Sequence, residues 1–218
     1  MFLKKKEQKY KKSYSQVGED MIIDFLFEIH GISKPSYIDI GAHDPYYYSN
    51  TAYFYSKGCK GINIEPNPVL FKNFLTTRKD DINLNIGIGG NNNRLNFYIM
   101  STATMSTFSK EQATELVSKH GFSIEDVIKV DVSTLNSVVD DYNGGIFPDF
   151  LSLDAEGLDF DILQMIDYEK NYPKVICVET IVYNDMNGKK EDDIIDFLQS
   201  KGYKIFADTY INTIFEKF

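Results

Sequence analysis

Several features that define other classes of protein are scarce in this chain. It has no tryptophan and only two cysteines, Cys59 and Cys177. These two cannot form a C-x-x-C redox or metal motif, and a disulfide framework needs more cysteines. Cys177 lies inside an apolar run, so we expect a buried small hydrophobic residue there. The cysteine content therefore predicts a protein of the reducing cytoplasm.

Long apolar stretches are also missing. No run approaches the roughly 18–20 residues of a membrane-spanning helix, so we expect no membrane span. Six lysines fall within the first twelve residues, with no apolar segment behind them. We expect a basic, solvated tail over residues 1–14 rather than a secretory signal, with a weak contact to an anionic surface as the alternative.

Positive charge is sparse outside that tail. Lysine and arginine number 23 against 32 aspartates and glutamates, and the net charge is −9. So acidic a body would repel nucleic acid phosphates, and we expect no nucleic acid partner. The length of 218 residues suits a single α/β domain, which we place over residues 15–218.

Helix and strand patterns alternate along the chain. Strands are predicted over residues 36–40, 60–65, 82–88, 149–154 and 174–179, with further strands at 94–100, 126–132, 203–207 and 211–215. Helices are predicted over residues 19–29, 111–120, 134–142, 160–166 and 192–201. Another helix is predicted between an N-cap at Ser49 and a C-cap at Gly58, and one more starts at Asn67 with Pro68 in its first position. The alternation predicts a mostly parallel sheet with helices on both faces, and the terminal strand pair adds one antiparallel strand.

Acidic residues and a glycine mark the ends of the first two predicted strands. Asp39 and Gly41 end the first strand, and Glu65 ends the second. Ligands of open α/β sheets bind outside the carboxyl ends of the strands. A glycine there lets a ligand approach the backbone, and a carboxylate can accept both hydrogen bonds of a ribose diol. This pair predicts an adenosine-type cofactor.

A nicotinamide dehydrogenase is the competing interpretation of such a strand end. It would need a G-x-G-x-x-G turn to seat a pyrophosphate. Here Gly41 and Ala42 are followed by His43, Asp44 and Pro45 and then by three tyrosines. The sequence therefore disfavours a dehydrogenase.

Four segments carry motifs that point to one family. Residues 15–20 (S-Q-V-G-E-D) precede the first strand, residues 39–45 and 49–51 follow it, residues 61–68 surround the second strand, and residues 153–157 (L-D-A-E-G) end a later one. In order and spacing they resemble the FkbM family of S-adenosylmethionine-dependent methyltransferases. The resemblance implies a class I methyltransferase (Rossmann-like) fold, whose seven-stranded mixed sheet agrees with the predicted elements. It departs in the loop after the first strand, where many relatives have Gly-Ala-Asn and this chain has Gly41-Ala42-His43 followed by Asp44 and Pro45, and we interpret this as a proline-stiffened loop.

The resemblance implies a set of contacts with S-adenosylmethionine. The expected binding residues are Gln16, Glu19, Asp39, Gly41, Ala42, Asn50, Thr51, Glu65, Pro66, Asn85 and Ile86. Glu65 is expected to hold the ribose, Gly41 and Ala42 to pass close to the methionine part, and Asp39 to take its amino group. Gln16 and Glu19 would reach the same end, or Glu19 would simply favour a helix N-terminus.

The sharpest candidates for chemistry are Asp154 and Glu156. Both lie at the tip of a predicted central strand, and two neighbouring carboxylates raise the pKa of one of them, which suits a general base. The alternative is that they cap the following helix, although Asp159 is available for that role. His43 is a second candidate base, or only a hydrogen-bonded turn residue.

A metal ion is a further expectation at this edge. Glu179 ends the next predicted strand, so Asp154, Glu156 and Glu179 would offer three oxygen ligands to magnesium or manganese. Such an ion would lower the pKa of a bound alcohol.

The expected reaction is methyl transfer from S-adenosylmethionine to a hydroxyl of a sugar or sugar nucleotide, as a precursor of a bacterial surface glycan. That substrate rests on the resemblance alone, and Tyr46, Tyr47, Tyr48 and Tyr183 would offer faces to a sugar. The alternatives are a secondary-metabolite acceptor, a nitrogen acceptor, or a catalytically silent cofactor-binding scaffold. A homodimer is a further expectation.

Overall fold

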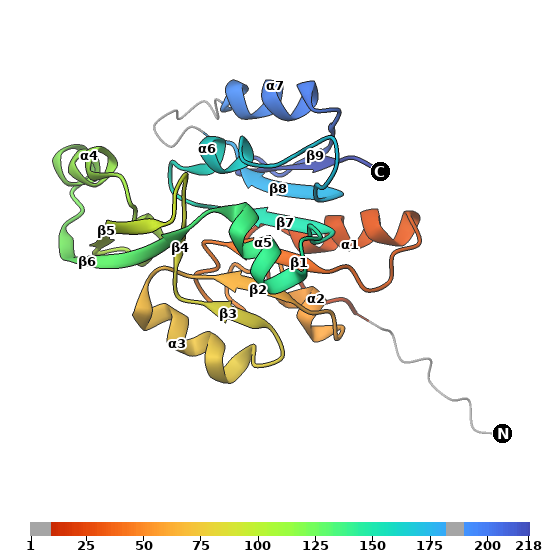
Figure 1. Ribbon diagram of the computed structural model, residues 1–218, viewed down its shortest axis with the longest axis horizontal. Helices are drawn as coiled ribbons and strands as arrows, with labels where there is room; N and C mark the ends of the chain where they lie inside the picture. Colours follow the sequence, from red (N-terminus) through yellow and green to blue (C-terminus); the bar gives the residue numbers. More distant parts are fainter. Residues whose placement is uncertain (1–9, 182–189) are drawn as a thin grey trace.

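The computed structural model describes residues 10–181 and 190–218 (Figure 1). Most lysines of the expected basic tail, and Tyr183, lie outside these residues. The helices are α1 (Glu19–Ile29), α2 (Ala52–Ser56), α3 (Pro68–Thr77), the 3-10 turn η1 (Ala103–Met105), α4 (Lys110–His120), α5 (Leu135–Asn143), α6 (Asp159–Leu163) and α7 (Asp192–Ser200). The strands are β1 (Tyr37–Ile40), β2 (Gly61–Ile64), β3 (Ile82–Leu84), β4 (Gly87–Ile88), β5 (Asn93–Met100), β6 (Ile124–Ser133), β7 (Phe150–Leu153), β8 (Val175–Glu179), β9 (Lys204–Asp208) and β10 (Asn212–Glu216).

The main sheet confirms the predicted fold class. Within the described residues it has seven strands in the order β3-β2-β1-β7-β8-β10-β9. The first five strands in this order, β3, β2, β1, β7 and β8, pair in parallel, while β10 is antiparallel to both of its neighbours. The sheet is therefore mixed and mostly parallel, with its one reversed strand supplied by the terminal strand pair.

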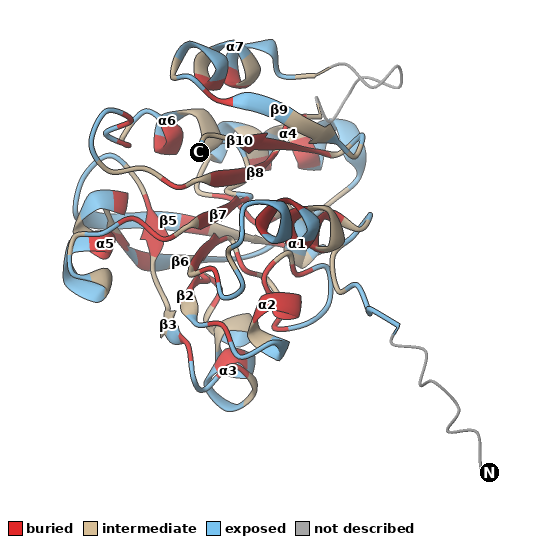
Figure 2. Cartoon of the chain, turned by 90° about the vertical axis from the view of Figure 1, so that its right-hand side faces the viewer, coloured by how far each residue is buried: buried red, intermediate tan, exposed pale blue. Residues whose placement is uncertain are grey.

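Alternation along the strands divides the core into two layers. Ile38 and Ile40 of β1 face the side that α5, α6 and α7 cover, and they belong to one buried apolar cluster. Tyr37 of β1 faces the other side and packs in a second cluster with residues of α1 and α2. Strands β7 and β8 lie between the two layers and are buried almost throughout (Figure 2). Their apolar runs are typical of central parallel strands.

One predicted strand is wrong. Residues 82–88 do not form a single strand, because β3 joins the main sheet and β4 joins a separate three-stranded sheet of order β4-β6-β5. The break falls at Asn85, whose side-chain amide donates to the carbonyls of Glu65 (2.8 Å) and Pro66 (3.0 Å). These bonds hold the chain against the end of β2 and redirect it into the small sheet. The small sheet, η1 and α4 then lie beyond the carboxyl ends of the central strands (Figure 1).

The start of α3 agrees with its predicted position more closely than the start of α2 does. At α3 the Asn67 side chain accepts from Val69 N–H (3.0 Å) and Pro68 takes the first helical position, as predicted. At α2 the Ser49 hydroxyl accepts from Ala52 N–H (3.1 Å), but the helix begins only at Ala52 and ends at Ser56. None of the helices formed by residues 10–181 and 190–218 has both the length and the apolar character to cross a membrane.

Candidate functional site

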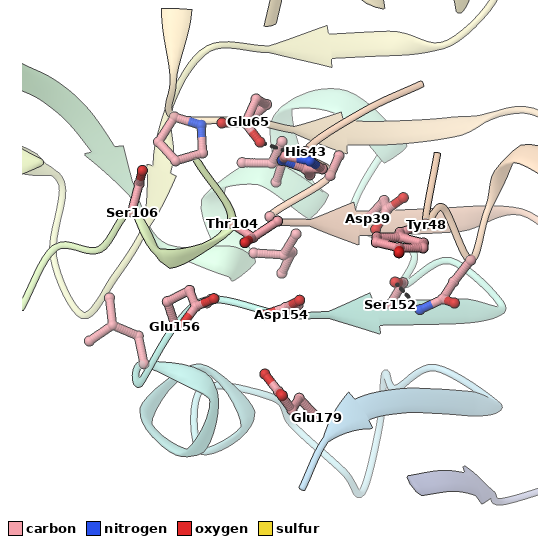
Figure 3. A pocket seen from close by; sticks show the side chains of 18 of the residues that line it. Asp39, His43, Tyr48, Glu65, Thr104, Ser106, Ser152, Asp154, Glu156 and Glu179 are labelled. Carbon is pink, nitrogen blue, oxygen red and sulfur yellow. Dashed lines mark hydrogen bonds between the residues drawn. The ribbon is translucent and has the colours of Figure 1, made fainter. Parts of the chain in front are cut away.

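A cavity of about 500 Å³ opens at the carboxyl ends of β1, β2, β7 and β8. One wall comes from these strand ends and the loop after β1, and the opposite wall from η1 and the small sheet (Figure 3). Its polar lining includes Gln16, Asp39, His43, Tyr48, Asn50, Glu65, Thr104, Ser106, Ser152, Asp154, Glu156, Glu179 and Asn212. These polar residues come from seven separate segments of the chain and meet at one sheet edge, where an α/β fold binds its ligands.

Glu65 is held rigidly at the tip of β2. The residue is 5% exposed, its Oε1 accepts from Asn67 N–H (2.7 Å), and its Oε2 accepts from His43 N–H (2.8 Å). Burial raises the pKa of Glu65 to about 7, although both backbone bonds oppose that shift. The two bonds fix the carboxylate plane and leave lone pairs on both oxygens for a diol.

Asp39 lies in β1, and its side chain reaches the cavity from below the loop. It is 4% exposed, and its Oδ2 accepts from the Thr51 hydroxyl at 2.7 Å. Burial raises the pKa of Asp39, while the Thr51 hydroxyl and the positive charge of Arg78 oppose that shift. Thr51 itself does not line the cavity, so its part in the site is to hold Asp39.

Gly41 is required by the sheet as well as by the cavity that it lines. Its φ is +76°, and a Cβ at this position would lie 1.8 Å from the backbone oxygen of Asp154. The close approach arises because Asp154 N–H donates to the Ile40 carbonyl (3.0 Å), which continues the β1–β7 pairing past the strand ends. Any side chain at this position would push these two strand ends apart.

Three carboxylates gather at the other end of the cavity. Asp154 follows β7, Glu156 lies two residues further, and Glu179 ends β8 (Figure 3). Asp154 is exposed to the cavity, but protein surrounds that space. Burial and the repulsion of Glu179 and Glu156 raise the pKa of Asp154 well above its usual range. Burial and neighbouring carboxylates likewise raise the pKa of Glu156 to about 8 and that of Glu179 to about 7.

The turn that carries Glu156 is shaped by side chains behind it. The Asp159 carboxylate accepts from Ala155 N–H (2.8 Å) and Gly157 N–H (3.3 Å), and Glu156 has a φ of +46°. α6 begins without a side-chain cap, so neither Asp154 nor Glu156 serves as its cap. A non-glycine residue at positive φ stores strain, which the two Asp159 bonds offset.

Thr107, in the loop before α4, and Gln112 of α4 both contact this turn. The Thr107 hydroxyl lies 3.1 Å from the Glu156 carbonyl and 2.8 Å from Gln112 Oε1. Gln112 Nε2 donates weakly to Glu156 Oε2 at 3.4 Å. No local motif marks these side chains, because only the packing of α4 against the main sheet brings them to Glu156.

The other predicted binding residues divide into two groups. Gln16, Ala42, Asn50 and Pro66 line the cavity. Glu19, Thr51, Asn85 and Ile86 do not, and Gly87 and Ile88 line it where Asn85 and Ile86 were expected.

Glu19 is buried away from the cavity. Its carboxylate accepts from Val17 N–H (2.9 Å), the Thr209 hydroxyl (2.8 Å) and the Asn212 amide (3.0 Å). These bonds tie the N-terminus of α1 to the turn between β9 and β10. Asn212 lines the cavity, so Glu19 is linked to the site through its hydrogen bond with Asn212 and does not reach the cavity itself.

His43 lies beside Glu65 rather than beside Asp154 and Glu156 (Figure 3). Its backbone has a φ of +54° and its N–H binds Glu65. Burial lowers the pKa of His43, so the imidazole is neutral at pH 7. The geometry groups His43 with the residues that hold Glu65, at a distance from the cluster predicted to handle protons.

The expected metal site has no support in the structure. Among residues 10–181 and 190–218, no three histidine, cysteine or acidic side chains are arranged to hold a metal ion. Asp154, Glu156 and Glu179 therefore share one cavity without converging on a common point. The Gln112 amide donates a hydrogen bond to the Glu156 carboxylate, and the carboxylates repel one another.

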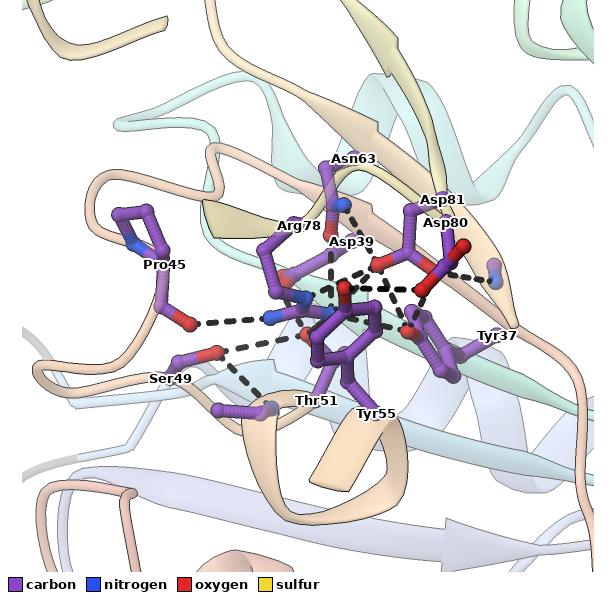
Figure 4. Close-up of polar contacts among 12 residues, drawn as sticks. Tyr37, Asp39, Pro45, Ser49, Thr51, Tyr55, Asn63, Arg78, Asp80 and Asp81 are labelled. Atoms are coloured by element: carbon purple, nitrogen blue, oxygen red, sulfur yellow. Dashed lines mark hydrogen bonds and ion pairs between the residues drawn. The ribbon is translucent and has the colours of Figure 1, made fainter. Parts of the chain in front are cut away.

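Arg78 is the functional candidate that sequence reasoning missed (Figure 4). It is fully buried, and its guanidinium is paired with Asp81 at 2.9 Å. The same group donates to the Pro45 carbonyl (3.0 Å), to the Tyr37 hydroxyl (2.9 Å) and to the Thr51 hydroxyl (3.2 Å). A lone arginine after a helix carries no sequence signal for such a role.

A second cavity of about 290 Å³ adjoins the first and shares Met105, Glu156, Glu179 and Ile181 with it. Its remaining lining includes Gln112, Glu115, Leu116, His120, Gly157, Asp159, Phe160, Glu191 and Ile194. The shared residues place Glu156 and Glu179 between the two spaces, whereas Asp154 lines only the larger cavity. Two ligands could therefore meet there.

Comparison with known proteins found one matching protein family and similar solved structures. The family model of the methyltransferase FkbM domain matches residues 39–205. No curated protein matches the chain. The solved structure of a proposed O-methyltransferase from Klebsiella pneumoniae has a backbone similar to that of this chain, with 8% sequence identity and a TM-score of 0.45. That similarity covers 91% of this chain and 78% of the other.

Proposed function

The chain belongs to the FkbM methyltransferase family, and from this membership we propose that it transfers a methyl group to a hydroxyl of a carbohydrate. Use of S-adenosylmethionine follows from the family. The observation that carries the oxygen-directed part is the position of Glu156, which follows Asp154 at the strand tip and lines both cavities. A carboxylate with a raised pKa can take a hydroxyl proton there. A precursor of a bacterial surface glycan fits by family analogy alone.

The lining of the larger cavity fits the donor. Its described residues include five carboxylates, Asp39, Glu65, Asp154, Glu156 and Glu179, and neither lysine nor arginine. Such a lining attracts a ligand that carries a positively charged sulfur and an ammonium group. In this proposal Glu65 holds the ribose hydroxyls and Asp39 the ammonium group. The methyl group then points toward Asp154 and Glu156.

The chain's own contribution to catalysis is position and proton transfer. S-adenosylmethionine supplies, when bound, a methyl group whose bond to sulfur breaks, with the electron pair left on sulfur, as the bond to the acceptor oxygen forms. Glu156 accepts the proton of the attacking hydroxyl. Asp154 binds the same hydroxyl and orients it. Much of the rate comes from holding the acceptor in line.

The acceptor occupies the adjoining cavity in this proposal. Phe160 and Leu116 give that space an apolar face. These groups suit the carbon face of a sugar ring, while the carboxylates suit its hydroxyls. The same carboxylates would repel a diphosphate, so the charge favours a neutral or amine-bearing sugar over a nucleotide-linked one.

The test separates donor binding from turnover. Glu156→Gln and Asp154→Asn are expected to lower methylation of a sugar acceptor at least 100-fold while S-adenosylmethionine affinity, measured by calorimetry, changes no more than about 3-fold. Asp161→Asn, on the exposed side of α6, is the matched control and keeps full turnover. A panel of neutral, amine-bearing and nucleotide-linked sugars, read by mass spectrometry, identifies the acceptor.

Three outcomes would contradict the proposal in different places. If the wild-type protein does not bind S-adenosylmethionine, this molecule is not the methyl donor. If the Glu156→Gln variant keeps full turnover, Glu156 is not the general base. Methylation of amines with no methylation of any hydroxyl would replace the oxygen acceptor with a nitrogen one.

A further inference from the structure

The loop between β1 and α2 forms much of the donor wall, and one buried side chain holds it from behind. Residues 41–43 and 48–50 of this loop line the larger cavity. Arg78 lies under the loop, is fully buried and does not reach the cavity. Its Nη1 donates to the Pro45 carbonyl at 3.0 Å, in the middle of the loop (Figure 4).

The same guanidinium also fixes the end of the loop. Arg78 Nη2 donates to the Thr51 hydroxyl at 3.2 Å, and the Thr51 hydroxyl donates to Asp39 Oδ2 at 2.7 Å. Because the hydroxyl has a single proton, accepting from Arg78 directs that proton to Asp39. Thr51 is thus a relay between a buried cation and a carboxylate that faces the cavity.

The remaining contacts of Arg78 make this anchor rigid. Its Nε donates to Asp81 Oδ2 at 2.9 Å, and its guanidinium lies 4.6 Å from the centre of the Tyr55 ring. Tyr37 donates to Asp81 Oδ1 at 2.8 Å and receives a bond from Arg78 at 2.9 Å. The guanidinium is therefore held from β1, from α2 and from the α3–β3 connection. A planar fork with five donors suits such a position, and a lysine would not replace it.

We propose that Arg78 is a positioning residue for donor binding, acting through Thr51 on Asp39 and through Pro45 on the loop after β1. This inference rests on the proposed binding of S-adenosylmethionine at the larger cavity. In this role Arg78 keeps Asp39 and the loop in the geometry that the donor requires. It contacts neither the donor nor the acceptor.

The sharpest test uses Thr51, because its side chain can be changed without disturbing the ion pair. Thr51→Val keeps the shape but removes the relay, and it is expected to raise the dissociation constant for S-adenosylmethionine about 10-fold. Thr51→Ser, which retains the hydroxyl, is expected to restore the affinity. Arg78→Lys is expected to weaken binding at least as much as Thr51→Val does.

Calorimetry separates this role from a merely structural one, since it gives affinity and stoichiometry together. A misfolded fraction lowers the stoichiometry, whereas a misplaced loop raises the dissociation constant at full stoichiometry. Asp24→Asn is the control, because Asp24 is 2% exposed at its side chain and paired with Lys11 and Lys57 outside the site. It is expected to lower the melting temperature and leave the dissociation constant unchanged.

The results that overturn the inference differ from those that overturn the proposed function. If the wild type does not bind S-adenosylmethionine, the proposed function fails first. If the wild type binds it but Thr51→Val and Arg78→Lys keep the wild-type dissociation constant, Arg78 has no positioning role. An equal loss of affinity in Asp24→Asn would mean that general loosening of the fold explains all of the effects.

Discussion

Glu65 is the residue whose replacement should weaken donor binding most directly. Glu65→Gln keeps the shape of the side chain but replaces one acceptor oxygen with a donor, so it loses one backbone bond as well as part of the ribose contact. We expect the dissociation constant for S-adenosylmethionine to rise about 10- to 100-fold, since hydrogen bonds to charged groups contribute about 1.5–3 kcal/mol.

Glu125→Gln is the matched control for this measurement, because it makes the same change on the exposed side of β6. It should leave the affinity unchanged in the same calorimetric titration. An unaltered affinity in Glu65→Gln itself would place the ribose elsewhere in the cavity.

Glu156 should give the reaction a distinctive pH dependence. A general base must be ionised, and burial with neighbouring carboxylates raises the pKa of Glu156 to about 8. We therefore expect kcat/KM to rise as pH increases from 6 and to level off above about 8, because this parameter reports the free enzyme. Since the neighbouring carboxylates titrate together, the measured midpoint belongs to the cluster. A rate that falls over this range would exclude an ionised carboxylate as the base.

The meeting of the β1 and β7 ends is the most tightly constrained feature among the elements around the site. Gly41→Ala would place a Cβ 1.8 Å from the Asp154 oxygen at a φ of +76°. We expect a loss of at least about 3 kcal/mol in the free energy of unfolding, or failure to fold. Chemical denaturation measures this loss.

Gly90→Ala is the comparison for that variant, because nothing lies within 4 Å of a Cβ there. It should change the free energy of unfolding by less than about 0.5 kcal/mol. Equal stability of the two variants would show that the strand ends can separate without cost.

The turn between β7 and α6 offers a test at the level of a single connection. Asp159→Ala removes the acceptor of Ala155 N–H and Gly157 N–H, so the turn that presents Glu156 should relax. Turnover is expected to fall about 10-fold or more while donor affinity stays near the wild-type value, because Glu65 and Asp39 are untouched. Steady-state kinetics and calorimetry on the same preparation check both expectations. A parallel loss of donor affinity would show that the turn also shapes the donor site.

The acidic cavity should also affect the stability of the protein as a whole. The pKa values of Glu65, Glu156 and Glu179 in the folded chain are raised to about 7, 8 and 7, whereas an unfolded glutamate titrates near about 4.3. Between these values the folded state binds more protons than the unfolded state. The free energy of unfolding therefore falls as pH rises from about 5 to about 8.

Thermal melting at pH 5.5, 7 and 8.5 tests this expectation in donor-free protein. The melting temperature should be lowest at pH 8.5, and S-adenosylmethionine should restore part of the loss by neutralising the cavity. The double variant Glu156→Gln and Glu179→Gln should flatten the dependence. A melting temperature that rises steadily with pH would contradict the assigned shifts.

Much of the sheet was predictable from the sequence, because its signals are local. The alternation of apolar runs and helical stripes gave the strands of the main sheet, and the motifs gave Asp39, Glu65 and Asp154 at their ends. The break at Asn85 was missed because the strand-like alternation of apolar residues from Ile82 to Ile88 continues through it, and only the bonds to the carbonyls of Glu65 and Pro66 reveal it.

The support behind the site was not predictable in the same way. Arg78 contacts side chains or carbonyls from β1, from the loop after it and from α2, which are far from it in the sequence. Gln112 and Thr107 reach Glu156 only because α4 packs across the sheet edge. Such residues are defined by long-range packing, for which a single sequence has no pattern.

The small sheet has a consequence for engineering this enzyme. The chain enters it at β4 and leaves it at the end of β6, and these two points are paired, Gly87 with Val132 and Ile88 with Ser133. Everything between them, including η1 and α4, is one continuous excursion whose two ends lie side by side. A chimaera that exchanges this excursion for that of a relative would replace one wall of both cavities and leave Glu65, Asp39 and Arg78 in place. Under the proposed function, such an exchange would vary the wall that faces both ligands while the strand-end carboxylates stay the same.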